Sequence, residues 1–175
     1  AREHVWRRQA VVCSTGVGRP RGSRLSKRPP GQGAGVLGSK RDVVFNGTQA
    51  VFENMGARGC GRIIHISSVN GQKGQFGQTN YSAAKAGMHG FSMALAQEGA
   101  AKGVTVNTVS PGYIETPMTS AIKPEALEKI KAQIPLGRMG TPAELARVVV
   151  FPSAAESGYI PGANLTVYRV LFVSA

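Results

Sequence analysis

Ser68 to Lys85, which reads SVNGQKGQFGQTNYSAAK, is the stretch that decides the fold of this chain. The apolar run Ile63–Ile66 leads into it, and a segment with helical spacing leaves it. Tyr81 and Lys85 stand four residues apart, so on a helix their side chains share one face, one turn apart. A hydroxyl from Ser68, a phenol and an ammonium brought together in this way can handle the proton of a carbonyl/alcohol pair.

The pattern of apolar residues on either side predicts an α/β protein. Strands are expected at 61–68, 104–109 and 163–167, and helices at 43–55, 79–98, 124–133 and 141–151, with loops at 69–78 and 113–123. Ile63, Ile64 and Ile66 make the first of these strands apolar enough for burial on both faces, which is typical of parallel strands. Strands that alternate with helices indicate a parallel sheet.

The charge of the chain is concentrated near its N-terminus. The net charge is +12, and residues 1–41 hold ten of the 21 Lys and Arg but only one of the nine Asp and Glu. Residues 10–13 could form a short strand and residues 14–18 a phosphate-binding turn, but the Arg, Pro and Gly after them favour a disordered or non-homologous segment. We therefore divide the chain into residues 1–41, residues 42–167 and an atypical tail at 168–175.

Composition narrows the possible functions further. Cys13 and Cys60 have no metal-ligand spacing, so no metal site is expected, and two lone cysteines favour a cytoplasmic location. No run of 18 apolar residues occurs, so no membrane span is expected. Two alternatives to catalysis stay open at this point. Tyr81 and Lys85 could stand on an ordinary surface helix, and the basic arm at 1–41 could bind nucleic acid nonspecifically through its Lys and Arg.

Four segments together carry a resemblance to a known family. They are Ser68 with Tyr81 and Lys85, Asn107, the loop 111–116 (PGYIET) and the helix start 137–144 (GRMGTPAE). In this combination the chain resembles the short-chain dehydrogenase/reductase family. Residues 70–81 and 86–91 are similar to the branch of that family that reduces acetoacetyl-CoA in polyhydroxybutyrate synthesis. The resemblance covers residues 43–167.

The resemblance implies a fold, a reaction and a set of site residues. The fold would be a Rossmann-like, doubly wound parallel sheet, and the reaction a reduction of a 3-oxoacyl-CoA by NADPH, with NADH not excluded. Tyr81 would protonate the keto oxygen, Lys85 would bind the nicotinamide ribose and favour the phenolate, and Ser68 would hold the keto oxygen. The residues implied in cofactor binding are Tyr81, Lys85, Pro111, Gly112, Ile114 and Thr116, and those implied in substrate binding are Gln75, Gln78 and Tyr113.

The chain also departs from the family pattern. Pro20 stands where the phosphate loop has its middle glycine, and only 53 residues separate Thr15 from Ser68. Because each βαβ unit takes about 30 residues or more, the first mononucleotide half is expected to be largely missing, as in an N-terminally truncated enzyme. We expect a homotetramer formed through the helix at 79–98. The alternative is a catalytically inactive fragment that only oligomerises.

Overall fold

The computed structural model describes residues 11–15 and 32–168, and within them four strands form one parallel sheet. The strands are β1 (Val11–Thr15), β2 (Gly61–Ile66), β3 (Val104–Pro111) and β4 (Asn164–Val167), and they lie in the order β1-β2-β3-β4. In the centre of the sheet, Ile63 pairs with Val106 and Ile66 with Val109. The carboxyl ends of the strands therefore meet at one edge of the sheet, where ligands of such folds bind.

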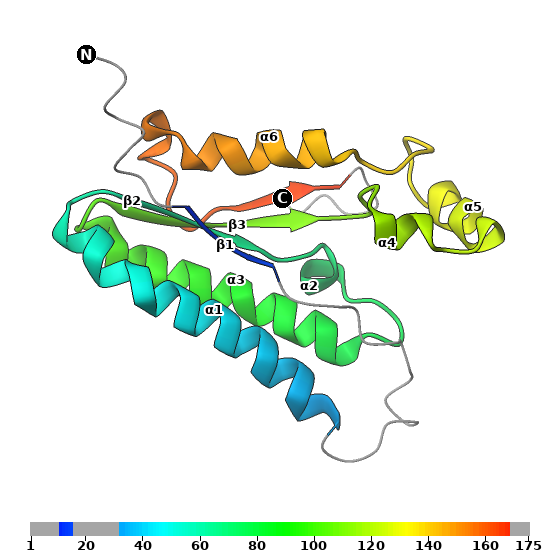
Figure 1. The fold of residues 1–175 in the computed structure, drawn as a ribbon, viewed down its shortest axis with the longest axis horizontal. Coiled ribbons are helices and arrows are strands. Elements are labelled where there is room, and N and C mark those ends of the chain that lie inside the picture. The colour runs from blue at the N-terminus through cyan, green and yellow to red at the C-terminus, as the bar shows by residue number, and fades with distance from the viewer. Residues whose placement is uncertain (1–10, 16–31, 169–175) are drawn as a thin grey trace.

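Helices cover both faces of this sheet (Figure 1). The long helices α1 (Gln32–Ala57) and α3 (Thr79–Ala100) lie side by side on one face, and α6 (Pro142–Ser153) lies on the other. Shorter helices fill the connections: α2 (Asn70–Lys73), α4 (Pro117–Ser120), α5 (Pro124–Ala132) and the 3-10 turn η3 (Ala155–Ser157). This arrangement confirms the expected α/β fold with a parallel sheet. Because the strand order shows no reversal, the described part resembles one half of a doubly wound sheet.

The core lies between the sheet and the two long helices. It contains Phe52 and Met55 from α1, Ile63 from β2, Ala96 from α3, and Val104 and Val106 from β3. Ile63 and its neighbour Ile64 are both fully buried, although adjacent residues of a strand face opposite sides of the sheet. The expectation that this strand is covered on both faces is therefore confirmed.

Some expectations about where helices lie differ from the structure. The helix expected from Val43 begins at Gln32, so the division drawn between residues 41 and 42 falls inside α1. The Gly-rich composition at 31–38 suggested no helix, but a helix between two paired parallel strands forms the crossover that joins them, and this requirement outweighs weak local propensity. The expected loops at 69–78 and 113–123 each contain one helical turn, α2 and α4. The possible phosphate-binding turn at 14–18 lies largely outside the described residues.

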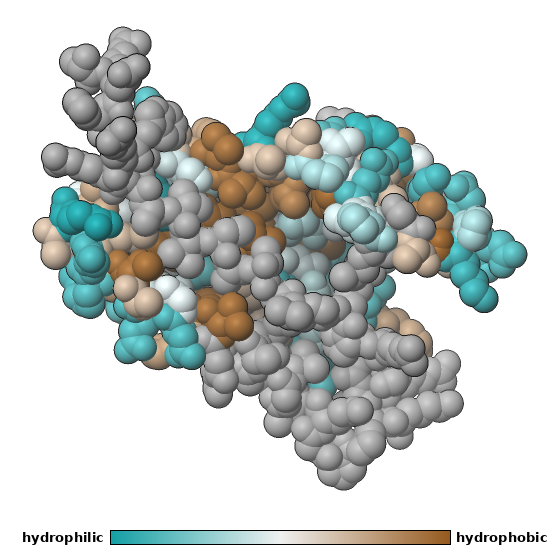
Figure 2. All heavy atoms as spheres, in the orientation of Figure 1, coloured by the Kyte–Doolittle hydropathy of each residue, from teal (hydrophilic) through white to brown (hydrophobic). Residues whose placement is uncertain are grey.

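Helix α6 begins after Thr141, as its sequence predicts. Some apolar side chains of this helix are exposed. Thr141 and Glu144 form the reciprocal hydrogen bonds of a capping box, as the sequence predicts. Apolar side chains gather over α6 on the face drawn in Figure 2. Two apolar residues near the end of this helix, Val150 and Phe151, are 59% and 53% exposed. In the described part of the chain, none of the helices has the length and apolar character that a membrane span needs.

Candidate active site

Ser68, Tyr81 and Lys85 lie where β2 ends and α3 begins. Ser68 follows the last residue of β2 by two positions and is buried. Tyr81 stands in the first turn of α3 and is half-buried, while Lys85, one turn later, is only 3% exposed. The three residues expected from their spacing therefore lie at the carboxyl end of one central strand and on the first two turns of the helix that follows.

Lys85 has a defined place inside this site. Its ammonium Nζ donates a hydrogen bond to the carbonyl oxygen of Ile66 at 2.6 Å. The same nitrogen lies 5.9 Å from the centre of the Tyr81 ring. A buried ammonium requires a hydrogen-bond acceptor, and the last carbonyl of β2 supplies one. The positive charge is thereby held beside the phenol ring.

The start of α3 is tied closely to the end of β2. Ser67 donates its hydroxyl to the Lys85 carbonyl at 2.9 Å. Gly71 approaches the same turn of α3 so closely that a Cβ added there would lie 2.7 Å from the Lys85 carbonyl carbon and 2.9 Å from Ala86 N. Only glycine allows this approach, which presses α2 and Ser68 against the helix that carries Tyr81 and Lys85.

Asn70 organises the loop between Ser68 and Tyr81. Its backbone N–H donates to the Ser68 hydroxyl oxygen at 3.2 Å. Its side-chain amide donates to Gln75 Oε1 at 2.6 Å and to Gln78 Oε1 at 3.2 Å. Two of the residues expected to bind substrate therefore converge on one buried asparagine. Sequence reasoning missed Asn70, although its position two residues after Ser68 was available as a signal.

The loop after β3 carries the segment expected to bind the nicotinamide. Gly112 N donates to the Val167 carbonyl at 3.0 Å, and Pro111 accepts from Val69 N at 3.1 Å. Ile114 is buried and forms a parallel bridge with Gly140. Thr116 caps α4, because its hydroxyl accepts from Thr119 N at 3.3 Å. The backbone of this segment is thus fixed against β4 and against the start of the loop after β2.

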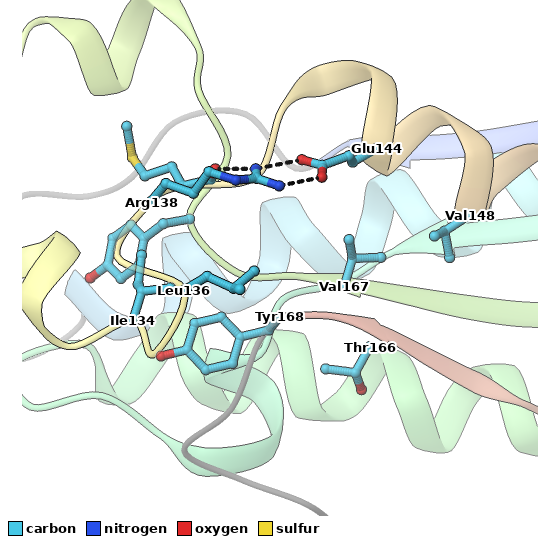
Figure 3. A pocket seen from close by; sticks show the side chains of 11 residues that line it. Ile134, Leu136, Arg138, Glu144, Val148, Thr166, Val167 and Tyr168 are labelled. Atoms are coloured by element: carbon cyan, nitrogen blue, oxygen red, sulfur yellow. Dashed lines mark hydrogen bonds and ion pairs between the residues drawn. The ribbon is translucent and has the colours of Figure 1, made fainter.

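A cavity of about 360 Å³ opens beside this loop, at the carboxyl ends of β3 and β4 (Figure 3). Tyr113, the third residue expected to bind substrate, lines it together with Ile134, Leu136 and Tyr168. At its rim Arg138 binds both carboxylate oxygens of Glu144, at 2.9 and 2.7 Å. These bonds from Arg138, with the backbone bond from Thr141, hold the pKa of the Glu144 carboxyl at about 2. Tyr113 therefore lies at a different part of the site from Gln75 and Gln78, which contact Asn70.

Two histidines, the buried His65 of β2 and the half-buried His89 of α3, lie near these groups. His89, one turn after Lys85, contacts the Ser110 hydroxyl at 3.2 Å. Burial lowers the pKa of His89, and the positive charge of Lys85 lowers it further. Burial alone lowers the pKa of the His65 ring to about 4. Both rings are therefore neutral at pH 7.

Among the described residues, groups of three or more His, Cys, Asp and Glu that could hold a metal ion are absent. The polar groups at the carboxyl ends of β2 and β3 are instead a buried ammonium, a phenol, a serine hydroxyl and the backbone of residues 111–116. These groups can bind hydroxyl and amide functions and can transfer a proton to an oxygen.

The fold and the polar groups of this site can be compared with those of known protein families. A family model described as enoyl-(acyl carrier protein) reductase matches residues 1–168. The chain belongs to the short-chain dehydrogenase/reductase family, and the resemblance stated from its sequence is confirmed.

The individual relatives narrow the comparison. The acetoacetyl-CoA reductase of Allochromatium vinosum is 59% identical over 138 residues, which are 79% of this chain and 56% of the relative. The acetoacetyl-CoA reductase of Cupriavidus necator is 58% identical over 131 residues, 75% of this chain and 53% of the relative. The 3-oxoacyl-[acyl-carrier-protein] reductase of Vibrio harveyi is 43% identical over 132 residues, 75% of this chain and 54% of the relative. The chain spans about half the length of these relatives.

The side of the site with Tyr81 and Lys85 fits a nicotinamide group, whereas on the side of the loop after β3 a side chain occupies the expected contact. Lys85 and Tyr81 present an ammonium and a phenol that can bind ribose hydroxyls. At the loop after β3, however, the ring of Tyr168 lies against Gly112, one of the residues expected to contact the nicotinamide. The residues of the expected phosphate loop from Gly16 onward lie outside the described part.

Proposed function

We propose that this chain carries the substrate-reducing site of an NAD(P)H-dependent reductase that converts a 3-oxoacyl-CoA, such as acetoacetyl-CoA, to the 3-hydroxyacyl-CoA. The single observation that carries the proposal is the position of Lys85, which is buried, bonded to the Ile66 carbonyl and adjacent to the Tyr81 ring. The relatives named as acetoacetyl-CoA and 3-oxoacyl reductases support the substrate class.

In the proposed mechanism the chain provides the proton and the alignment. A reduced nicotinamide, when bound, supplies the hydride. Tyr81 donates its phenolic proton to the keto oxygen, and the Lys85 ammonium stabilises the phenolate that remains. Ser68, held by Asn70, donates a hydrogen bond to the same oxygen. We also propose that Pro111, Gly112, Ile114 and Thr116 contact the nicotinamide.

Gln75, Gln78 and Tyr113 are proposed to contact the acyl-CoA. For the two glutamines, the support is that both accept hydrogen bonds from the side chain of Asn70, whose backbone N–H donates to the Ser68 hydroxyl. Tyr113 is supported by its place in the wall of the cavity. We propose NADPH as the preferred reductant and polyhydroxybutyrate synthesis as the setting, on the basis of the relatives, and a cytoplasmic location, where acyl-CoA thioesters are held.

We propose, in addition, that the chain forms a homo-oligomer through α3 and the neighbouring α1. The specific oligomer that we propose is a homotetramer. Two apolar grooves of about 230 and 200 Å³ lie between these helices and share Phe45 and Phe91. The two rings lie 6.2 Å apart, and Phe45 is 49% exposed. A partly exposed aromatic pair on a surface of small residues fits helix-to-helix association. An inactive fragment that only oligomerises is the second candidate, favoured by the ring that covers Gly112.

The reductase proposal predicts that Tyr81→Phe abolishes turnover. The oxidation of NADPH, and separately of NADH, would be followed in the presence of acetoacetyl-CoA. Because the phenol supplies the proton, kcat should fall by about a hundredfold or more. Tyr159→Phe is the matched control, since Tyr159 is 98% exposed, and it should retain the parent rate.

Two other outcomes would contradict the proposal. If Tyr81→Phe keeps the parent rate, Tyr81 is not the acid. If the parent chain oxidises neither cofactor but still associates, the inactive oligomerising fragment is the correct description.

A further inference from the structure

Tyr168 occupies the space above Gly112. A Cβ added to Gly112 would collide with Cδ2 of the Tyr168 ring and would lie 2.9 Å from Cε2 and Cγ. The absence of a side chain at Gly112 is thus what allows the ring to rest on the backbone. The family resemblance did not anticipate this contact, because Tyr168 falls in the tail that departs from the family pattern.

Contacts from α2 hold the ring in this place. Lys73 Nζ lies 5.1 Å from the centre of the Tyr168 ring, within the range of a cation–π interaction. Two residues earlier on β4, the Thr166 hydroxyl exchanges hydrogen bonds with the Gln72 side chain at 3.1 and 3.3 Å. The end of β4 is therefore attached to the helix that directly follows Ser68.

On its other side the ring borders open space. Tyr168 lines the cavity of about 360 Å³, next to Ile134 and Leu136 (Figure 3). The cavity is large enough to receive a phenol ring, and its wall is mostly apolar. A rotation about the Tyr168 side-chain bonds would transfer the ring from Gly112 into this cavity without a change of the strand.

We infer that Tyr168 controls the access of a nicotinamide dinucleotide to the site, because its ring covers the Gly112 backbone that the nicotinamide must contact. This inference rests on the proposed function. The ring and the nicotinamide cannot occupy the same space above Gly112. Binding therefore requires the ring to leave Gly112 and Lys73, and the affinity is lowered by the free energy of that displacement.

The test is the dissociation constant of NADPH, measured by the fluorescence of the reduced nicotinamide, for the parent chain, Tyr168→Gly and Tyr168→Phe. Removal of the ring should lower the dissociation constant by about tenfold, as expected when a competing aromatic contact is removed. Tyr168→Phe keeps the ring and should stay within about twofold of the parent. Thermal unfolding of each variant shows whether the fold is retained.

A second variant keeps the inference testable if Tyr168→Gly fails to fold. Lys73→Gln keeps a polar side chain and removes the charge above the ring, so the dissociation constant should fall by about two- to fivefold. The inference is overturned if Tyr168→Gly and Lys73→Gln, where they fold, bind NADPH with the affinity of the parent. In that case the proposed function stands, whereas both fall if neither the parent nor any variant binds NADPH.

Discussion

At the scale of single residues, Lys85 combines two properties that rarely occur together, a positive charge and almost complete burial. Its ammonium donates a hydrogen bond to the carbonyl oxygen of Ile66. A carbonyl dipole orients the ammonium, whose nitrogen lies 5.9 Å from the centre of the Tyr81 ring. This arrangement supports the acid-base role that we propose for Tyr81.

Gly71 is the residue on which this environment depends most directly. We predict that Gly71→Ala lowers the free energy of unfolding by about 1–3 kcal/mol, because the new methyl group must separate α2 from the Lys85–Ala86 backbone. Urea unfolding would measure the change. Gly47→Ala is the control, since nothing lies within 4 Å of its added Cβ, and in helix α1 it should stabilise by about 0.5–1 kcal/mol. If Gly71→Ala is as stable as the parent, the contact between α2 and α3 is looser than described.

At the scale of elements, one buried hydrogen-bond chain joins α1, β2 and α3. The Ser92 hydroxyl donates to the Met88 carbonyl at 2.7 Å, so it accepts from His65 Nδ1, also at 2.7 Å. His65 Nε2 then accepts from the Thr48 hydroxyl at 2.9 Å. With these donor and acceptor roles the His65 ring is neutral and carries its proton on Nδ1.

The stability of the protein should therefore depend on pH. The pKa of His65 is about 4 in the folded protein and 6.5 in the unfolded chain, so its neutral form stabilises the fold above pH 6.5. As the pH falls from 6.5 through 4, about 3 kcal/mol of this stability is lost. Urea unfolding at about pH 7.5 and about pH 4.5 would measure the loss.

Two variants separate the contributions to this loss. His89, whose pKa is also lowered, adds a loss of the same sign, which His89→Gln removes. His65→Gln should flatten the remaining dependence on pH. An unchanged slope in His65→Gln would show that the ring is not the group that titrates.

At the scale of the whole molecule, the described chain leaves two surfaces with exposed apolar side chains. One is the face of α1 and α3 with the exposed Phe45 and the half-buried Phe91, and the other is on α6 with Val150 and Phe151. The first surface also carries small residues, which allow another helix to approach closely. It is therefore the surface that we propose for association.

Gly87→Glu should prevent this association. Gly87 lines the groove between α1 and α3, and nothing lies within 4 Å of its added Cβ, so the isolated subunit has room for the side chain. A charge at the centre of an apolar contact opposes its burial. Light scattering after size-exclusion chromatography should show an oligomer for the parent and a monomer for Gly87→Glu. Ala126→Glu, on the exposed surface of α5, should keep the parent mass. Equal masses for the parent and Gly87→Glu would refute this interface.

The sequence by itself determined the class of the fold and the local order of the site. Short apolar runs were enough to predict the strands, and apolar residues at three- and four-residue steps were enough to predict the helices. The four-residue spacing of Tyr81 and Lys85 was enough to place both on one face of α3. These features could be predicted because they depend on neighbours along the chain, whose relative positions are set by helix and strand geometry. Gly71 and Asn70 stood in the same stretch without a recognised role.

Only the tertiary structure decided how the segments meet. The bond from Lys85 to Ile66, the convergence of Gln75 and Gln78 on Asn70, and the Tyr168 ring on Gly112 each join groups whose distance depends on packing. The last of these contacts joins residues that are far apart in sequence and adjacent only because β3 and β4 pair in one register. The stretch from Ser68 to Lys85 therefore indicates the chemistry, and the packing of β4 against α2 and β3 decides what can reach it.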